Sequence, residues 1–414
     1  MKTNGSNANT LRNDNRALLL SRIRRQPVSR AQLSKETGMS KSAVTMITNE
    51  LIAEGQLREI GTADSPKGRR PILLDIVPDY RYAVGVSLHR KRLQVLVTTL
   101  KAELVSCVEE RTERFAAADE AVDWLCRTIR RELDRLHIPL SRVVGIGISS
   151  PGPLDTEKGV ILTPPNFAMF HNLPIVSRMR QEFRLPVFLE NNSVLLAMTE
   201  YSSGVLDGYH NTLFVIMSHG IGSCLLREGQ VFRGCGGHAG ELGHASIDLN
   251  GQPCSCGNRG CLEQYATMAA LRQRFGFADY AAVVDAAYRG DPASREILAY
   301  QARHLAAGLV TSVNLFDLDS IVLYGEFNYR PELLFSLLAD KIRRQSLITR
   351  VHPVEVLPSR LGPYADAVSS TAVVLDRHFG QQLAGGEDVP AQPGRYAGKP
   401  RAALFPLSDA TPHF

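Results

Sequence analysis

Long hydrophobic runs are absent from this chain of 414 residues. A membrane-spanning helix needs about eighteen consecutive apolar residues, and no such stretch occurs. The first residues, Met-Lys-Thr-Asn-Gly-Ser-Asn, also lack the apolar core of a secretory signal. We therefore expect a cytoplasmic protein without membrane insertion.

Cysteine is scarce as well, with seven residues in the whole chain. Four of them, Cys107, Cys126, Cys224 and Cys235, show no spacing typical of a disulfide framework, which suits a reducing compartment. The length leaves room for two or three domains and a sizeable core.

The other three cysteines fall within eight positions, and a histidine precedes them. Glycines and a proline crowd the same loop, which lets a short segment fold around a point. Tetrahedral zinc takes four such ligands, and four protein ligands leave no place for an activated water. The pattern predicts a structural zinc ion rather than an ordinary turn of small residues, with the ligands His244, Cys254, Cys256 and Cys261.

The net charge of +5 is unevenly spread. Residues 1–78 hold 13 Lys and Arg against 7 Asp and Glu, which leaves 34 basic and 35 acidic residues in the rest of the chain. A basic segment on a neutral body is typical of proteins that bind the phosphate backbone of nucleic acids.

Three helices fit the first 55 residues. The first spans 11–25, with Leu18, Leu19 and Ile23 on its apolar stripe together with Leu11. The second, 29–38, opens with a serine cap, and a turn leads into a third helix capped by Ser40. This is helix-turn-helix geometry, in which the polar face of the third helix is free for a major groove. The residues expected to face DNA are Lys41, Ser42, Thr45, Thr48 and Asn49.

A wing is expected after the third helix, with strands at 56–60 and 70–76. Lys67, Arg69 and Arg70 lie between or at the edge of these strands, flanked by prolines that keep the segment extended. Extended arginines fit a narrow minor groove. A three-helix protein-interaction domain is the alternative, but the charge surplus favours double-stranded DNA.

From residue 80 onward, apolar strands alternate with helical patterns, which indicates the α/β class. The expected strands span 82–87, 93–100, 143–149, 185–190, 212–217 and 320–324, and the expected helices span 122–136, 193–203 and 295–315.

Several of these segments resemble the ROK family of repressors and sugar kinases. The best markers are Ser150-Pro-Gly-Pro-Leu-Asp155, Pro165-Asn166, Gly236-Gly-His-Ala-Gly-Glu241-Leu-Gly-His244 and Cys254-Ser-Cys256-Gly-Asn-Arg-Gly-Cys261-Leu-Glu263. With the amino-terminal helix-turn-helix, the chain resembles the repressor branch for xylose, glucose and N-acetylglucosamine. The resemblance implies a winged helix-turn-helix followed by a two-lobed, actin-like ATPase fold with a sugar cleft.

The expected domains follow from this fold. Residues 1–78 form the DNA-binding domain and linker. Residues 79–207 form the first lobe, which a helix near 365–379 rejoins, and residues 208–364 form the second lobe with the zinc site. Residues 380–414 lack periodicity and are expected to be a disordered tail.

The resemblance also implies the residues that contact a sugar. Hydroxyl-rich ligands need convergent amides and carboxylates, and a wrong sugar leaves such groups unpaired. The matching positions are Asn166, Asn191, Asn192, Glu241, His244 and Glu263.

The kinase pattern fails at three places. Where the family's first phosphate loop has Asp-Ile-Gly-Gly-Thr, this chain has Ser87-Leu-His89-Arg90-Lys91, which we expect to be a solvated turn. In the second loop, Ser218-His219-Gly220 replaces Gly-Thr-Gly. Asn192 stands at the position of the catalytic base, and an amide cannot accept a proton from a sugar hydroxyl.

The sequence therefore predicts a sugar-responsive transcriptional regulator of the repressor type that is not an enzyme. It would bind a palindromic operator as a homodimer or homotetramer. A sugar kinase that retains a DNA-binding domain is one alternative, and a regulator whose effector is a sugar-transport protein is another. The sugar, the operator, and whether the ligand releases or recruits DNA stay open.

Overall fold

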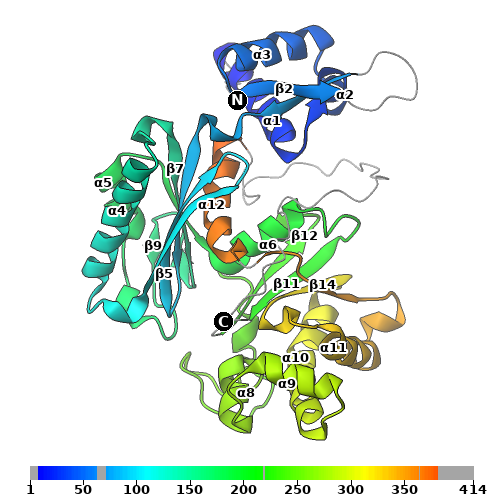
Figure 1. Ribbon diagram of the computed structural model, residues 1–414. Helices are drawn as coiled ribbons and strands as arrows, with labels where there is room; N and C mark the ends of the chain where they lie inside the picture. Colours follow the sequence, from blue (N-terminus) through cyan, green and yellow to red (C-terminus); the bar gives the residue numbers. More distant parts are fainter. Residues whose placement is uncertain (1–7, 63–70, 218–219, 363, 381–414) are drawn as a thin grey trace, which may run out of the picture. The chain divides into compact units, whose positions relative to one another are not determined.

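The computed structural model describes residues 8–62, 71–217, 220–362 and 364–380 (Figure 1). The chain divides into two compact units, each assembled from separate stretches. Within the described residues, the first unit takes in 8–150, 174–190 and 366–380, and the second takes in 151–173 and 191–365.

The first unit begins with the predicted helix-turn-helix. Ser29 caps the second helix by accepting from the Gln32 N–H at 3.2 Å, and Ser40 caps the third by accepting from Ala43 N–H. Gly38 ends the second helix at φ 71°, a left-handed conformation that glycine adopts without strain. The helices are α1 (Ala8–Arg25), α2 (Arg30–Thr37) and α3 (Lys41–Ala53), so the first begins three residues earlier than expected.

A three-stranded sheet in the order β1-β3-β2 completes this domain. Its antiparallel strands are β1 (Val28–Ser29), β2 (Leu57–Thr62) and β3 (Ile72–Ile76). The predicted wing hairpin, now β2 and β3, is thereby confirmed.

The rest of the first unit is built on a five-stranded sheet in the order β10-β7-β4-β5-β6. Strands β4 and β5, both expected from the sequence, form an antiparallel hairpin, and β4 pairs with β7 in parallel. The strands are β4 (Tyr82–Leu88), β5 (Arg92–Thr99), β6 (Leu104–Arg111), β7 (Val143–Ser150) and β10 (Val187–Asn191), whose last residue falls in the second unit. The helices are α4 (Ala118–Arg135), α5 (Ile175–Phe183) and α12 (Ala365–His378).

Helix α12 lies directly on this sheet because two glycines permit it. A Cβ atom on Gly147 would lie 1.9 Å from the Ser370 carbonyl oxygen, and one on Gly85 would lie 2.2 Å from the Ser370 hydroxyl. Any larger residue at either position would push the helix off the strands. The last helix among the described residues thus packs against the first strand of this sheet.

The second unit repeats the same plan, with the order β13-β12-β11-β14-β15. Counted along the chain, both sheets place their strands as third, second, first, fourth and fifth. The strands are β11 (Asn211–Met217), β12 (Ile221–Arg227), β13 (Gln230–Val231), β14 (Ser320–Gly325) and β15 (Glu355–Pro358), preceded by the small hairpin β8 (Leu154–Asp155) and β9 (Val160–Ile161).

Helices cover both faces of this second sheet. Along β11, Leu213, Val215 and Met217 pack into one apolar cluster, whereas Phe214 and Ile216 pack into another on the opposite face. This alternation is the period-two pattern of a strand that is buried on both sides. The helices are α6 (Asn192–Ser202), α7 (Glu263–Ala266), α8 (Met268–Phe275), α9 (Tyr280–Tyr288), α10 (Pro292–Phe316) and α11 (Glu332–Gln345).

None of the described helices combines the length and the apolar character that a bilayer-spanning segment requires. The expected tail beyond residue 380 lies outside the described residues.

Candidate metal centre and ligand-binding residues

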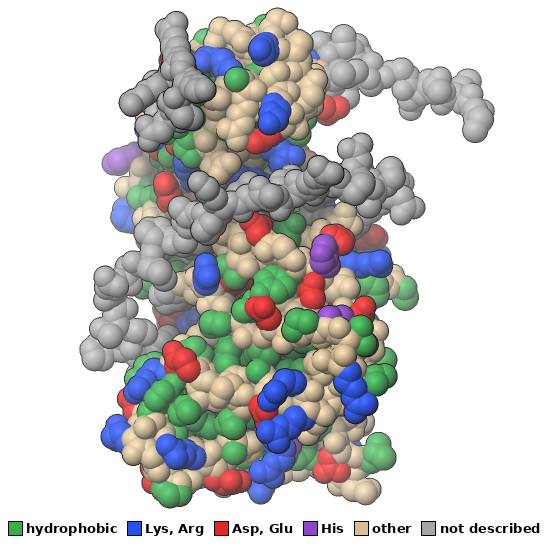
Figure 2. All heavy atoms as spheres, turned by 90° about the vertical axis from the view of Figure 1, so that its right-hand side faces the viewer, with side chains coloured by type: hydrophobic (Ala, Val, Ile, Leu, Met, Phe, Trp, Pro, Cys, Tyr) green, Lys and Arg blue, Asp and Glu red, His purple; other side chains and the backbone are tan. Residues whose placement is uncertain are grey.

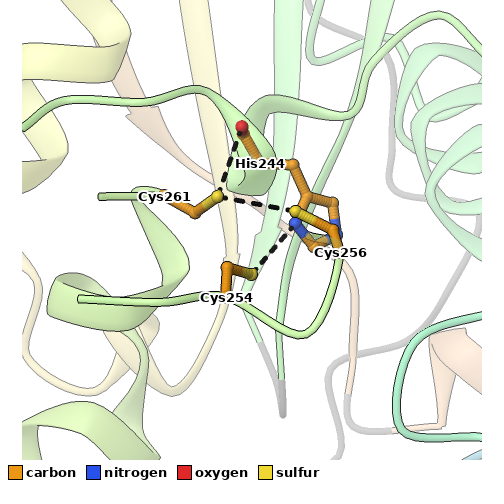
Figure 3. Close-up of side chains that lie close together, drawn as sticks. All are labelled: His244, Cys254, Cys256 and Cys261. Atoms are coloured by element: carbon orange, nitrogen blue, oxygen red, sulfur yellow. Dashed lines mark hydrogen bonds between the residues drawn. The ribbon is translucent and has the colours of Figure 1, made fainter. Parts of the chain in front are cut away.

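The four predicted metal ligands meet in the second unit (Figure 3). His244 ends a short 3-10 turn, Leu242–His244, that follows β12 and β13. The three cysteines come from the loop that runs from this turn into α7. One ligand atom from each residue lies within 4.8 Å of the others.

The spacing of these atoms fits a tetrahedral ion. With metal–sulfur bonds of about 2.3 Å, the ligands of a tetrahedral site lie about 3.8 Å apart. The Cys256 and Cys261 sulfurs are 3.7 Å apart, and the Cys254 sulfur lies 3.6 Å from Nδ1 of His244 (Figure 3). The residues present therefore fit a metal ion held by three sulfurs and one imidazole nitrogen, which is a donor set compatible with zinc.

Backbone turns shape the loop of the candidate metal centre. Gly260 has φ 66°, and a Cβ atom there would lie 1.8 Å from the Asp248 carbonyl oxygen, so only glycine fits. The Cys254 N–H donates to the Asn258 carbonyl at 2.8 Å, which closes the loop around Cys256. The loop is therefore held in shape by its own backbone.

Protons compete with a metal for these thiols. Burial, with the neighbouring Cys254 and Cys256 thiols, raises the pKa of Cys261 to about 12. Burial also raises the pKa of Cys254. Because only thiolates bind a metal ion, uptake of one here would release protons and would become weaker as the pH falls.

Two residues near the metal ligands were not foreseen as part of this centre. The Gln264 amide donates to the Cys254 sulfur at 3.4 Å, and Asn258 Nδ2 lies 3.5 Å from the His244 carbonyl. Such outer contacts orient metal ligands. Asparagine and glutamine occur so often in loops that their types alone carried no signal.

Glu263, a predicted sugar contact, lies at the edge of the metal cluster. Its Oε1 is 3.2 Å from the Cys254 sulfur and 3.6 Å from His244 Nδ1. The His244 side chain is 21% exposed and that of Glu263 12%. Because Nδ1 faces the cysteines, Nε2 is the ring nitrogen of His244 left for another partner.

Glu241 and Asn191, two further predicted sugar contacts, converge on one backbone position. A Cβ atom on Gly152 would lie 2.7 Å from the Asn191 amide nitrogen and 3.5 Å from Glu241 Oε1. Glu241 precedes the 3-10 turn of His244, and its carbonyl accepts from the His244 N–H at 3.0 Å. Gly152 was not predicted to lie among the candidate ligand-binding residues, although its position between two prolines predicts a turn.

Asn191 and Asn192 stand where β10 passes into α6. The Ser193 N–H donates to Oδ1 of Asn191 at 2.8 Å and to Oδ1 of Asn192 at 2.9 Å. Both amides are thereby fixed at the start of the helix. Asn166 lies on a different loop, exposed and at φ 55°, beside the packed rings of Phe167 and Phe170.

The turn between β4 and β5 differs from the expected solvated loop. His89 is only 12% exposed, and its Nε2 lies 2.8 Å from Oδ2 of Asp366 and 3.0 Å from the Ser87 hydroxyl. The expectation was wrong for His89 because Asp366, in the first turn of α12, supplies a carboxylate to it. Lys91 is exposed as expected.

On α3, Lys41, Ser42, Thr45 and Asn49 are exposed, whereas Val44, Ile47 and Leu51 are buried. Thr48 is the exception, because it is completely buried and its hydroxyl donates to the Val44 carbonyl at 2.8 Å. The prediction that Thr48 faces DNA is therefore wrong. Met46, which was not predicted, is 55% exposed.

Other predicted residues lie outside the described ranges. These are Lys67, Arg69 and Arg70 of the wing segment and Ser218 and His219 of the second phosphate loop.

The sequence profile of the ROK family matches residues 83–376. This chain belongs to the ROK family. The xylose repressor of Bacillus spizizenii is 31% identical over 376 residues, which cover 88% of this chain and 95% of the repressor. A solved ROK family transcriptional regulator, a homologue of the Escherichia coli Mlc protein, has a TM-score of 0.75 and 26% identity, covering 90% of this chain and 98% of that one. The ROK hexokinase of Thermus thermophilus has a TM-score of 0.58 and 29% identity, covering 70% of this chain and 96% of its own.

The predicted resemblance and fold are thus confirmed. The matches with the xylose repressor and the ROK regulator cover 88% and 90% of this chain, whereas the match with the hexokinase covers 70% of it. The ROK profile begins at residue 83, after the winged helix-turn-helix. The repressor-type relatives therefore match this ROK protein more completely than the hexokinase does.

Proposed function

We propose that this protein is a sugar-responsive transcriptional repressor that acts in the cytoplasm. The observation that carries the proposal is the exposed, polar face of α3 on a capped helix-turn-helix that precedes a kinase-like body. Such a face suits the edges of bases in a major groove. The xylose repressor and the ROK regulator among its relatives support the same function.

The effector would be a sugar or a sugar derivative bound in the second unit. Asn191 and Glu241, which converge on Gly152, would accept and donate hydrogen bonds to its hydroxyls. Asn166, Asn192 and Glu263 would extend this set, and His244 would contribute Nε2 while Nδ1 binds the metal. Binding would shift the protein between conformations that differ in operator affinity.

The metal would be a structural zinc ion held by His244, Cys254, Cys256 and Cys261. Four protein ligands close its coordination sphere, so its contribution is to brace the loop that carries Glu241 and Glu263.

Phosphotransfer is not part of the proposed function. Asn192 cannot act as a base, and its Oδ1 already accepts from a backbone N–H. In the β4–β5 turn, the Asp366 carboxylate would repel a phosphate. The alternative is a sugar kinase that retains a DNA-binding domain. It predicts turnover of the nucleotide in a hydrolysis assay with a panel of sugars.

The test of the proposed function starts from double-stranded DNA of random sequence. Fragments enriched on the purified full chain supply an operator, and fluorescence anisotropy then measures its affinity with and without each of a panel of sugars and sugar phosphates. We expect a preferred operator and a change of affinity with one ligand class. A chain that binds all DNA equally, or that ignores every sugar, contradicts the proposal in its DNA-binding or its effector part, respectively.

Two residues of α3 are expected to contribute differently to DNA binding. Lys41→Ala removes a positive charge, so the affinity for all sequences should fall and the salt slope should decrease by about one. Thr45→Ala removes a hydroxyl on the exposed face, so one base position of the operator should lose discrimination by about tenfold. Anisotropy titrations against operator variants at several salt concentrations measure both effects. Identical behaviour of the two variants would contradict this division of roles.

A further inference from the structure

One large apolar side chain lies among the exposed polar residues of α3, the candidate recognition helix. Met46 is 55% exposed. It follows Ser42 by four residues and precedes Asn49 by three, and residues at these spacings share one face of a helix. Ser42, Thr45 and Asn49 are all exposed on that face. Under the proposed function, Met46 therefore belongs to the face that meets the base edges of the operator.

The exposure of Met46 would not single it out without this position. Hydrophobic side chains reach the surface at many places on the face of the molecule drawn in Figure 2, and single ones are ordinary. Within the described residues, α3 packs on its own domain through Val44, Ile47 and Leu51, each at most 2% exposed. That packing leaves Met46 on the outer side, where an apolar side chain gains only if a partner covers it.

The polar side chains beside Met46 are held by contacts within the domain. The Thr45 hydroxyl donates to the Lys41 carbonyl at 2.8 Å, and the Ser42 hydroxyl lies 3.0 Å from the hydroxyl of Ser40. These contacts restrict the side chains that flank Met46. A ligand that docks on this face thus meets a polar surface with one large apolar side chain in it.

The major groove of DNA offers one apolar group that fits this arrangement. Base edges present nitrogen and oxygen donors and acceptors there, and thymine alone adds a methyl group at C5. Methionine suits a contact with it, because the side chain is unbranched and flexible and has no hydrogen-bond donor. A cytosine in the same place would present its amino group to a side chain that is only a weak acceptor.

We propose that Met46 is a specificity-determining residue that recognises the methyl group of a thymine in the operator half-site read by α3. The contact removes that methyl group and the Met46 side chain from water together, and it favours thymine over cytosine. The inference rests on the proposed function, because it takes α3 to lie in a major groove. A protein partner for this face is disfavoured by charge, since residues 1–78 carry the positive surplus that suits a phosphate backbone.

Uracil lacks only the methyl group of thymine, so it isolates the contact. In one half-site of the operator selected with the unaltered chain, each thymine is replaced in turn by deoxyuridine, and fluorescence anisotropy measures the affinity. We expect the Kd to rise about fourfold at one position, the effect of one buried methyl group. Met46→Ala should bind the thymine and uracil forms of that position alike. Met46→Leu, which keeps an apolar side chain of similar volume, should retain most of the difference.

Leu18→Ala is the matched control, because it shortens an apolar side chain of α1 that is 38% exposed. It should keep the full preference for thymine, and circular dichroism checks that every variant is folded. The proposal is overturned if no thymine responds to uracil in the unaltered chain, or if folded Met46→Ala still responds at the same position. An unaltered chain that selects no operator at all refutes the proposed function itself, and the contact with it.

A second, independent observation concerns Arg30 at the start of α2. Its guanidinium donates to the Thr48 hydroxyl at 3.1 Å, to Oδ1 of Asn49 at 3.0 Å and to Oε1 of Glu59 at 2.9 Å. Thr48 and Asn49 belong to α3, whereas Glu59 belongs to β2. One side chain thus joins the candidate recognition helix to the wing.

We infer that Arg30 is a positioning residue that sets the geometry of operator reading. Its fork of donors fixes α3 against β2, and it orients the Asn49 amide so that its NH2 group points away from Arg30. A lysine would keep the charge but lacks the planar fork that makes three bonds at once. The inference rests on the proposed DNA binding.

Arg30→Lys separates positioning from charge. Affinity for the selected operator and for a scrambled duplex is measured across salt concentrations. We expect the ratio of the two affinities to fall about tenfold, while the salt slope stays unchanged. Lys35→Ala, an exposed charge on the same helix, is the control and should lower both affinities without altering their ratio. An unchanged ratio in Arg30→Lys overturns the positioning role, whereas an unaltered chain without operator preference refutes the proposed function instead.

Discussion

A protein in which Cys256 is replaced by serine should lose stoichiometric zinc and melt at a lower temperature. Cys256 is exposed, so the substitution itself disturbs little packing, and any large effect must come from the lost metal ligand. Because metal binding is coupled to local folding, we expect the free energy of unfolding to fall by about 3 kcal/mol. That corresponds to a melting temperature lower by roughly 6–12 °C for a unit of this size.

Metal content by mass spectrometry and thermal melts check this result. Cys235→Ser is the matched control, since Cys235 is an exposed cysteine outside the cluster. Full zinc occupancy and unchanged melting of Cys256→Ser would remove the metal assignment. Equal losses of zinc and of melting temperature in Cys256→Ser and Cys235→Ser would point to a general effect of cysteine replacement.

Glu241→Ala is expected to abolish the response at the sugar concentrations to which the unaltered chain responds, without unfolding the protein. Glu241 is exposed, so its truncation leaves no cavity, but it removes a charged hydrogen-bonding group beside Asn191. A hydrogen bond to a charged group is worth about 2–3 kcal/mol, which raises the sugar concentration needed by roughly a hundredfold. Zinc content and operator affinity in the absence of sugar should stay near those of the unaltered chain.

Anisotropy with operator DNA, titrated with the sugar found in the screen, measures this response. Glu157→Ala, which removes an exposed carboxylate in a turn of the same unit, is the control. A Glu241→Ala protein that responds at the usual sugar concentration would place the effector site elsewhere.

Local signals made much of this molecule predictable. Serine caps, a glycine stop and an apolar stripe define α2 and α3 within about 25 residues. The four candidate metal ligands likewise lie close together in the sequence, so their meeting in space needed no knowledge of the remaining fold.

Contacts between distant segments were not predictable in this way. The partner of His89 is Asp366, far along the chain, so nothing near residue 89 indicated that its side chain would be covered. The same holds for Arg30, whose three acceptors lie on two other elements.

Thr48 was misplaced for a different reason. A threonine in a helix can donate its hydroxyl to the carbonyl four residues earlier, as Thr48 does to Val44, and this allows the side chain to be buried. Residue type therefore suggested an exposed side chain, whereas the spacing of four residues from buried Val44 placed it on the inner side.

The close packing of α12 on Gly85 and Gly147 has a consequence for synthesis on the ribosome. Strand β4 is made about 280 residues before α12, which at about 5–20 residues per second is a delay of roughly 15–60 s. During that time the face of the sheet that receives Ser370 stays uncovered. The helix-turn-helix leaves the ribosome before the body joined to it, and that body can close only after residues 365–378 have been made. A message cut short before codon 365 would therefore yield a DNA-binding segment joined to an unfinished body.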